Sequence, residues 1–226
     1  MEHGQTLEIA RPDGKPLRAY AAVPAHADAA TPTVIVIQEW WGLNSHICDI
    51  ADRFALAGYR ALAPDLYHGQ LASNADEASH LMNELDFADA VHQDLAGVLA
   101  RLQASCKGAI GVTGFCMGGA LTIAAAVRLP GLAAASCFYG IPPREFADPA
   151  QIAIPFQGHF AALDDWCTPA AVDALQARLP AGIAAEIHRY PAHHAFFNDK
   201  RPEVHDAACA ALAWERTLEF FGKHLR

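Results

Sequence analysis

The sequence has little of what marks several common function classes. No apolar run approaches the length of a membrane-spanning helix, and residues 1–6 carry neither the basic nor the apolar segment of a secretory leader. Lys and Arg number 16 against 25 Asp and Glu, so the formal net charge is −9 and attraction to nucleic acid or to an anionic membrane is not expected. We therefore expect a cytoplasmic protein, a monomer or homodimer, whose partners are small molecules, with no nucleic acid and no membrane.

The cysteines lack the spacing of a metal site. None of the six forms a C-x-x-C pair, and no zinc-ligand spacing connects them, so free thiols are expected in a reducing compartment. HExxH, GxGxxG and P-loop patterns are also missing. These absences predict a protein that needs no metal and no organic cofactor.

The composition that is present favours one globular α/β domain. Hydrophobic residues make up 53% and charged residues 18% of 226 residues, which suits a sizeable core. The β-branched run 33–37 has no polar alternation, as expected for a strand of a parallel sheet that is buried on both faces. We predict a single domain over residues 1–226.

Strand and helix signals alternate along the chain. After a hairpin over 6–23 we predict strands over 33–37, 59–63, 109–113, 133–139, 152–157 and 184–190, and helices over 45–57, 74–104, 121–127, 168–179 and 202–226. This order predicts a doubly wound, mostly parallel sheet with helices on both faces and an N-terminal hairpin.

The segment Gly114-Phe115-Cys116-Met117-Gly118 stands between a predicted strand and a predicted helix. Glycines two residues before and two after a central residue, on a strand-to-helix turn, form the nucleophile elbow that pushes one side chain out above a sheet. Cys116 is therefore a candidate nucleophile. The alternative is a small, buried, structural cysteine, which is common for this residue type.

A nucleophilic thiol needs a base and a group that orients the base. In α/β-hydrolases these follow the nucleophile in the order acid, then histidine. The loop 158–169 carries Asp164 and Asp165 after a predicted strand, and the loop 190–196 carries His193 and His194 after the last strand. The order along the chain therefore agrees with a hydrolase triad.

Taken together, these motifs make the chain resemble the dienelactone hydrolase family of α/β-hydrolases. The resemblance rests on Gln38-Glu39-Trp40-Trp41-Gly42, on the elbow around Cys116, on an acid four residues before Pro169 and on His194-Ala195-Phe196. It implies the α/β-hydrolase fold and a carboxylic ester or lactone hydrolase, similar to carboxymethylenebutenolidase, that works through a thioester acyl-enzyme.

The resemblance also implies roles for individual residues. By position, the triad is Cys116, Asp165 and His194, since the acid of the family stands four residues before the proline and its histidine two before Phe. Glu39 is implied to hold and activate the Cys116 thiol. The backbone N–H groups of Trp40 and Met117 are expected to form the oxyanion hole.

The predicted substrate pocket comprises Trp41, Trp166, Phe196 and Asn198. The aromatic residues lie on the predicted loops around Cys116 and suggest an apolar mouth for an acyl or aryl group; the alternative is that they are core residues that pack a lid. Family members that act on the lactone of a chlorocatechol pathway hold the substrate carboxylate with arginines, one of them at the position of Asn198. A neutral amide cannot replace a guanidinium as a clamp for an anion. We therefore expect a different substrate, with neutral esters hydrolysed at least as well as carboxylated lactones.

Two other functions are compatible with the same residues. A non-catalytic hydrolase-fold protein could use Cys116 to sense a ligand or an oxidant, although a sensor needs no acid and histidine in triad order. A metal hydrolase could use His193, His194, Asp164 and Asp165, but adjacent histidines rarely turn both rings to one ion.

Overall fold

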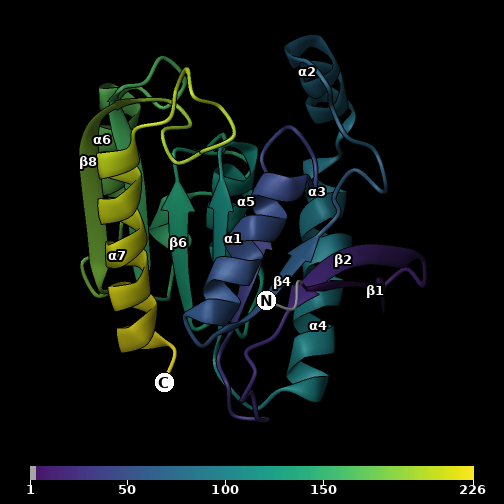
Figure 1. Ribbon diagram of the computed structural model, residues 1–226. Coiled ribbons are helices and arrows are strands. Elements are labelled where there is room, and N and C mark those ends of the chain that lie inside the picture. The colour runs from purple at the N-terminus through teal and green to yellow at the C-terminus, as the bar shows by residue number, and fades with distance from the viewer. Residues whose placement is uncertain (1–3) are drawn as a thin grey trace.

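The computed structural model describes residues 4–226 and has one eight-stranded sheet at its centre (Figure 1). The strand order is β1-β2-β4-β3-β5-β6-β7-β8. Only β1 and β2 run antiparallel to their neighbours, so the remaining six strands form the expected parallel sheet. The strands are β1 (Gln5–Ala10), β2 (Pro16–Ala22), β3 (Thr33–Ile37), β4 (Arg60–Pro64), β5 (Ile110–Phe115), β6 (Ala134–Phe138), β7 (Phe156–Leu163) and β8 (Ala185–His193).

Helices cover both faces of this sheet. They are α1 (Ser45–Leu56), α2 (Ala75–Glu84), α3 (Phe87–Asp89), the π-helical turn η1 (Ala90–Leu95), α4 (Ala96–Ser105), α5 (Met117–Arg128), the 3-10 turn η2 (Pro149–Gln151), α6 (Pro169–Arg178) and α7 (Ala207–His224). Helices α1 and α7 pack on one face, and α4, α5 and α6 pack on the other. The predicted α/β-hydrolase architecture is thereby confirmed.

The central strand β3 explains how the two layers are held together. All five of its side chains are buried. Val34 and Val36 belong to the apolar cluster under α1 and α7, whereas Ile35 and Ile37 belong to the cluster under α4 and α5. An uninterrupted β-branched run is what a strand with helices on both faces requires.

The predicted long helix over 74–104 is wrong, because the chain breaks at Leu85. Leu85 has extended backbone angles, and the carboxylate of Asp86 accepts hydrogen bonds from the N–H groups of Ala88 and Asp89. Asp86 therefore caps a new helix. Helix α2 consequently stands apart at the end of the molecule where the parallel strands end (Figure 1).

Two other predicted boundaries are also wrong. The last helix begins at Ala207 rather than at residue 202, because Asp206 caps it by accepting a hydrogen bond from the Cys209 N–H. Strand β7 covers Phe156–Leu163 rather than 152–157, so it ends directly before Asp164.

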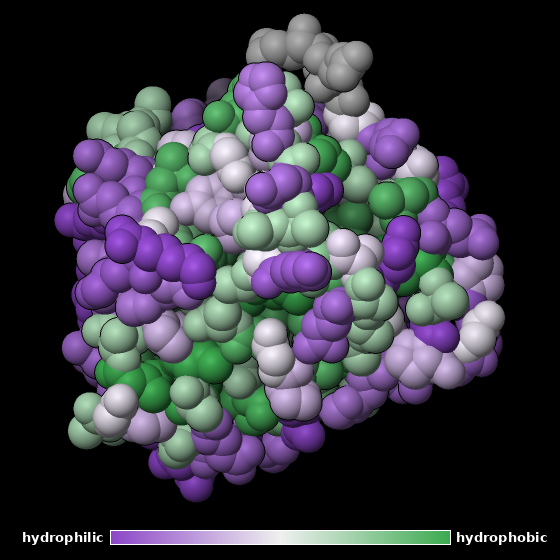
Figure 2. Space-filling view, turned by 90° about the horizontal axis from the view of Figure 1, so that it is seen from below, coloured by the Kyte–Doolittle hydropathy of each residue, from purple (hydrophilic) through white to green (hydrophobic). Residues whose placement is uncertain are grey.

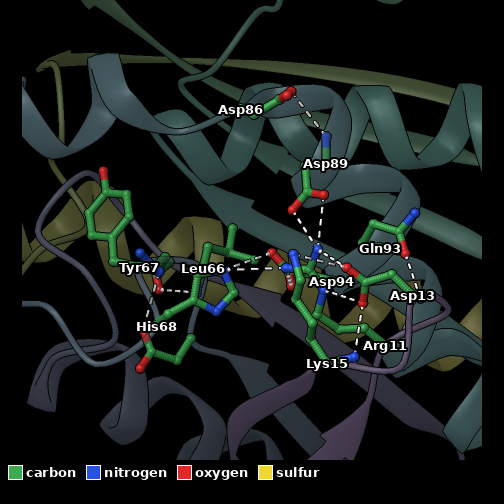
Figure 3. Close-up of polar contacts among 12 residues, drawn as sticks. Arg11, Asp13, Lys15, Leu66, Tyr67, His68, Asp86, Asp89, Gln93 and Asp94 are labelled. Carbon is green, nitrogen blue, oxygen red and sulfur yellow. Dashed lines mark hydrogen bonds and ion pairs between the residues drawn. The ribbon is translucent and has the colours of Figure 1, made fainter.

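A buried arginine ties the segment after α2 to the N-terminal hairpin (Figure 3). The Arg11 guanidinium donates to both carboxylate oxygens of Asp89 at 2.8 and 2.9 Å, to Asp94 at 3.0 Å and to Asp13. Burial raises the pKa of Asp94 to about 6, although the charges of His68 and Arg11 oppose this shift. We call Arg11, Asp13, Asp89 and Asp94 the Arg11 cluster.

Figure 2 shows the lower face of the molecule as drawn in Figure 1, on which hydrophilic residues lie among hydrophobic ones and no one class dominates. Across the part of the chain that the structure describes, every helix is too short or too polar to cross a membrane.

Candidate active site

Cys116 lies on the sharp turn between β5 and α5, where the sequence predicts an elbow. Its backbone angles are φ 54° and ψ −117°, a conformation that side-chain-bearing residues rarely adopt. A turn with these strained backbone angles is the kind that presents a nucleophile above a sheet.

The glycines beside Cys116 are required by close backbone packing. A Cβ atom at Gly114 would overlap the backbone of Gly118, and one at Gly118 would overlap the carbonyl groups of Ile37 and Gln38. The helix that follows the elbow therefore packs directly on the ends of β3 and β5, as only residues without Cβ allow.

The acid paired with His194 is Asp164, so the prediction of Asp165 is wrong in geometry. Nδ1 of His194 donates a hydrogen bond to Oδ2 of Asp164 at 2.8 Å. Asp164 is 3% exposed, and its Oδ1 also accepts from the N–H groups of Trp166 and Cys167 at 2.7 and 3.0 Å. Asp165 is exposed to solvent, because the side chains on either side of Asp164 turn outward.

The charges around His194 favour its protonated form. Burial alone would lower the pKa of His194, but hydrogen bonds to Asp164 and Cys116, together with their negative charge, raise it to about 10. Burial raises the pKa of Asp164, yet its hydrogen bonds to His194 and to two backbone N–H groups lower it below the ordinary value. A hydrogen bond therefore joins His194 to Asp164, and Cys116 lines the same pocket close enough to influence the pKa of His194.

Glu39 is buried beside this chain, and its carboxylate is held by neutral donors. Its exposed fraction is 1%, and it accepts hydrogen bonds from the Tyr139 hydroxyl at 3.2 Å and from Nδ2 of Asn198 at 2.6 Å. No hydrogen bond joins it to Cys116 within residues 4–226, although both residues line the same pocket. An acid this deeply buried is tolerated because its oxygens are satisfied.

Tyr139 is a site residue that the sequence reasoning missed. Its φ is 35°, an outlier for a bulky side chain, and its ring meets the His194 ring edge-on at 5.1 Å. It thus contacts both Glu39 and His194. A positive φ at a tyrosine leaves no recognisable pattern in the sequence, so sequence reasoning could not identify this residue.

Two residues of the pocket wall have backbone N–H groups that are in no hydrogen bond among the described residues. The N–H groups of Trp40 and Met117 make no hydrogen bond within the described chain, and both residues line the pocket around Cys116. Met117 is also the first residue of α5, where the helix dipole favours negative charge. The oxyanion hole formed by these two groups stays a prediction.

The pocket above Cys116 has a volume of about 430 Å³, which suits a small organic molecule. Trp41 and Trp166 line it as predicted. Phe196 and Asn198 do not line it. Phe196 is completely buried in the core, and Asn198 is 1% exposed and donates its side-chain N–H to Glu39. The chain reverses at Ala195, whose φ is 63°, and this turn carries both side chains inward.

Other lining residues were not predicted. Arg201 lines the pocket, pairs with Glu203 at 2.8 Å and lies 5.3 Å from the ring centre of Trp41. Met82 and Phe87 reach the pocket from the segment of α2 and α3. To predict Met82 and Phe87 as lining residues, one would have to know how the segment of α2 and α3 crosses the edge of the sheet.

The arrangement does not support the metal-site alternative. His193 is exposed and its Nδ1 donates to the carbonyl of Leu163 at 3.1 Å, away from His194. Among residues 4–226 no group of three or more His, Cys, Asp or Glu side chains is arranged to hold a metal ion.

Comparison with known proteins agrees with this geometry. The model of the dienelactone hydrolase family matches residues 17–225. The Aquifex pyrophilus protein usf is 36% identical, with 98% of this chain and 99% of that protein covered. A protein of Aquifex aeolicus, proposed by its name to be a carboxymethylenebutenolidase, is 33% identical over 99% of this chain and 100% of its own length.

Solved structures show the same fold. A Klebsiella pneumoniae protein proposed to be a dienelactone hydrolase superposes with a TM-score of 0.87 at 30% identity, covering 99% of this chain and 100% of that one. A dienelactone hydrolase-like promiscuous phosphotriesterase from metagenomic libraries reaches 0.84 at 22% identity, with both chains fully covered. The chain belongs to the dienelactone hydrolase family and is a hydrolase.

Proposed function

We propose that the protein hydrolyses carboxylic esters or lactones through a thioester on Cys116, with His194 and Asp164 completing the triad. The observation that carries this proposal is that one pocket brings together a cysteine on a strained elbow and His194, which is hydrogen-bonded to the buried Asp164. This arrangement matches the requirements for an activated thiol: a base within reach and an acid that orients the base.

In the acylation step, the Cys116 thiolate attacks the carbonyl carbon of the ester and a C–S bond forms. The π electron pair moves onto the carbonyl oxygen, and the N–H groups of Trp40 and Met117 stabilise the resulting oxyanion. When the intermediate collapses, the C–O bond to the alcohol breaks. Protonated His194 supplies the proton that the departing alcohol needs.

Deacylation uses the same histidine as a base. In the neutral thioester the thiolate charge is gone, so one of the influences that raise the pKa of His194 is absent. Its Nε2 can then take a proton from water, whose oxygen attacks the thioester carbon. The C–S bond breaks, the carboxylic acid product leaves, and the thiolate and imidazolium are restored.

We propose that Cys116 carries a proton while the site is empty and that Glu39 takes this proton when substrate binds, which leaves protonated His194 free to serve the alcohol. After the product leaves, Glu39 returns the proton to the Cys116 thiolate. Its burial, its place in the pocket wall and its two neutral donors support an acid that is positioned without being neutralised by a cation. Glu39→Gln should therefore lower kcat/KM for ester hydrolysis by about 10²-fold, as loss of an acid–base group does.

The control for this variant is Glu215→Gln, which changes an exposed carboxylate on α7, outside the pocket. The comparison is made by steady-state hydrolysis of p-nitrophenyl acetate. Full activity of Glu39→Gln would contradict a role of Glu39 in proton transfer.

Mass spectrometry of the intact protein tests the proposed function directly. After brief incubation with p-nitrophenyl acetate, the wild type should carry an acetyl adduct on Cys116 that clears with time. His194→Ala should keep the adduct, and Cys116→Ala should form none. If the wild type forms no adduct and releases no product, the hydrolase proposal fails and the ligand or redox sensor becomes the better account.

The pocket composition bears on the charge of the substrate. Besides protonated His194, which is paired with Asp164, the described lining includes Arg201, whose charge is compensated by Glu203 and which lies over the Trp41 ring. We therefore propose that neutral small esters are hydrolysed at least as well as carboxylated lactones. A strong preference for carboxylated lactones in a comparison of kcat/KM would contradict this.

A further inference from the structure

We infer that the pocket has an apolar arm which receives the acyl group of the substrate, and that Ala120, Met82 and Phe87 set the length of acyl group it accepts. This inference rests on the proposed function. The walls of the arm are Met82, Phe87, Ala120, Ile141, Pro142 and Pro143.

The position of Ala120 connects the arm to the nucleophile. Ala120 lies one helical turn after Cys116 in α5, and its N–H donates to the Cys116 carbonyl at 3.1 Å. Residues four apart in a helix share one face, so the pocket extends from the thiol along this face of α5. A methyl group here leaves open space where a longer side chain would fill the arm.

The far wall comes from a different part of the chain. Met82 lies in α2 and Phe87 begins α3, and both side chains are only partly buried although they line the pocket. The other side of the Phe87 ring meets Phe146 edge-on at 6.2 Å. The Arg11 cluster anchors the end of this segment through Asp89 (Figure 3).

The direction of the arm identifies the acyl group as its occupant. The departing alcohol must lie toward His194, which gives it a proton, and the Trp166 ring lies 6.2 Å from the His194 ring on that side. The acyl group remains attached to Sγ and extends away from His194. The walls of the arm carry no charged side chain, so an unbranched alkyl acyl group fits them better than a polar one.

The experiment compares two ester series on the purified protein. In the first the acyl group of p-nitrophenyl esters grows from acetate through butyrate to hexanoate, and in the second the alcohol of alkyl acetates grows from ethyl to hexyl. For the wild type we expect kcat/KM to rise by up to about fourfold per added acyl methylene until the arm is full. The alcohol series should show a weaker trend.

Ala120→Leu should lower kcat/KM for the hexanoate at least about tenfold more than for the acetate, mainly through KM. Phe87→Ala should instead extend the accepted length beyond that of the wild type. The matched control is Ala211→Leu on the exposed face of α7, which should leave the length profile unchanged.

The outcomes separate the two proposals. If acetyl-Cys116 forms but the variants reduce all acyl lengths equally, or if only the alcohol series responds, the arm is refuted while the hydrolase stands. If no ester is turned over and no adduct forms, both proposals fail.

Discussion

At the scale of single residues, the acid of the proposed triad is the most instructive position. The sequence predicted Cys116 and His194 because a glycine-flanked turn and the order along the chain leave few choices. Between two adjacent aspartates the choice depends on which one turns inward. Strand β7 has an irregular register between Ala161 and Leu163, so simple alternation cannot decide it, and no residue pattern revealed that irregularity.

The two aspartates form a matched pair for mutagenesis. Asp164→Asn should lower kcat about 10²–10⁴-fold, because the amide cannot stabilise the protonated imidazole or enforce its tautomer. Asp165→Asn should stay close to the wild type, because the side chain faces solvent. The measurement is hydrolysis of p-nitrophenyl acetate by both variants. A larger loss for Asp165→Asn would restore the original sequence prediction.

At the scale of elements, the strands of the sheet were readable from sequence and the segment 74–105 was not. Apolar residues at helical spacing continue through Leu85, so the pattern predicted one long helix. The break depends on Asp86 as a cap and on Asp94, which turns inward to Arg11. The helix cap at Asp86 and the buried ion pair of Arg11 and Asp94 therefore determine where this helix breaks, despite the continuous helical spacing of apolar residues.

The Arg11 cluster should contribute strongly to the stability of this segment. The Arg11 and Asp94 side chains are 4% and 1% exposed, so Arg11→Met leaves a carboxylate buried without its partner. We expect the free energy of unfolding to fall by about 3 kcal/mol, the lower end of the usual range, because Asp94 can take up a proton. Urea denaturation measures this loss.

A neighbouring cation supplies the control. Lys15 is 73% exposed and contacts Asp13 at 3.5 Å, so Lys15→Met should change stability by less than about 0.5 kcal/mol. The double variant Arg11→Met with Asp94→Leu should recover much of the loss. Equal losses for the Arg11 and Lys15 variants would show that the cluster contributes no more than a surface pair.

At the scale of the whole molecule, the pocket is assembled from segments that are far apart in the sequence. The elbow and the histidine loop were predicted to meet because both follow strands of one sheet. The contribution of α2 and α3, and that of Arg201, depends on how long connections cross the sheet edge. Such paths are set by tertiary packing, which a local pattern does not encode.

The pair of His194 and the buried Asp164 also links global stability to pH. The folded protein raises the pKa of His194 from its ordinary 6.5 to about 10, so it binds this proton more tightly than the unfolded chain does. The resulting stability is complete below about pH 6.5 and is lost as the pH rises toward 10. Urea midpoints should therefore fall over this range in the wild type and fall less in His194→Gln. Parallel profiles for the two proteins would contradict the assignment.

The tryptophans have a consequence for how the protein can be observed. Three of the four, Trp40, Trp41 and Trp166, border the pocket, with centroid separations of 5.2 and 6.1 Å from Trp40 to the other two. The fourth, Trp214, packs away from them against Phe54. Three of the four indoles therefore border the pocket that contains Cys116, so the fluorescence of the unlabelled protein can report on occupancy and acylation of this pocket.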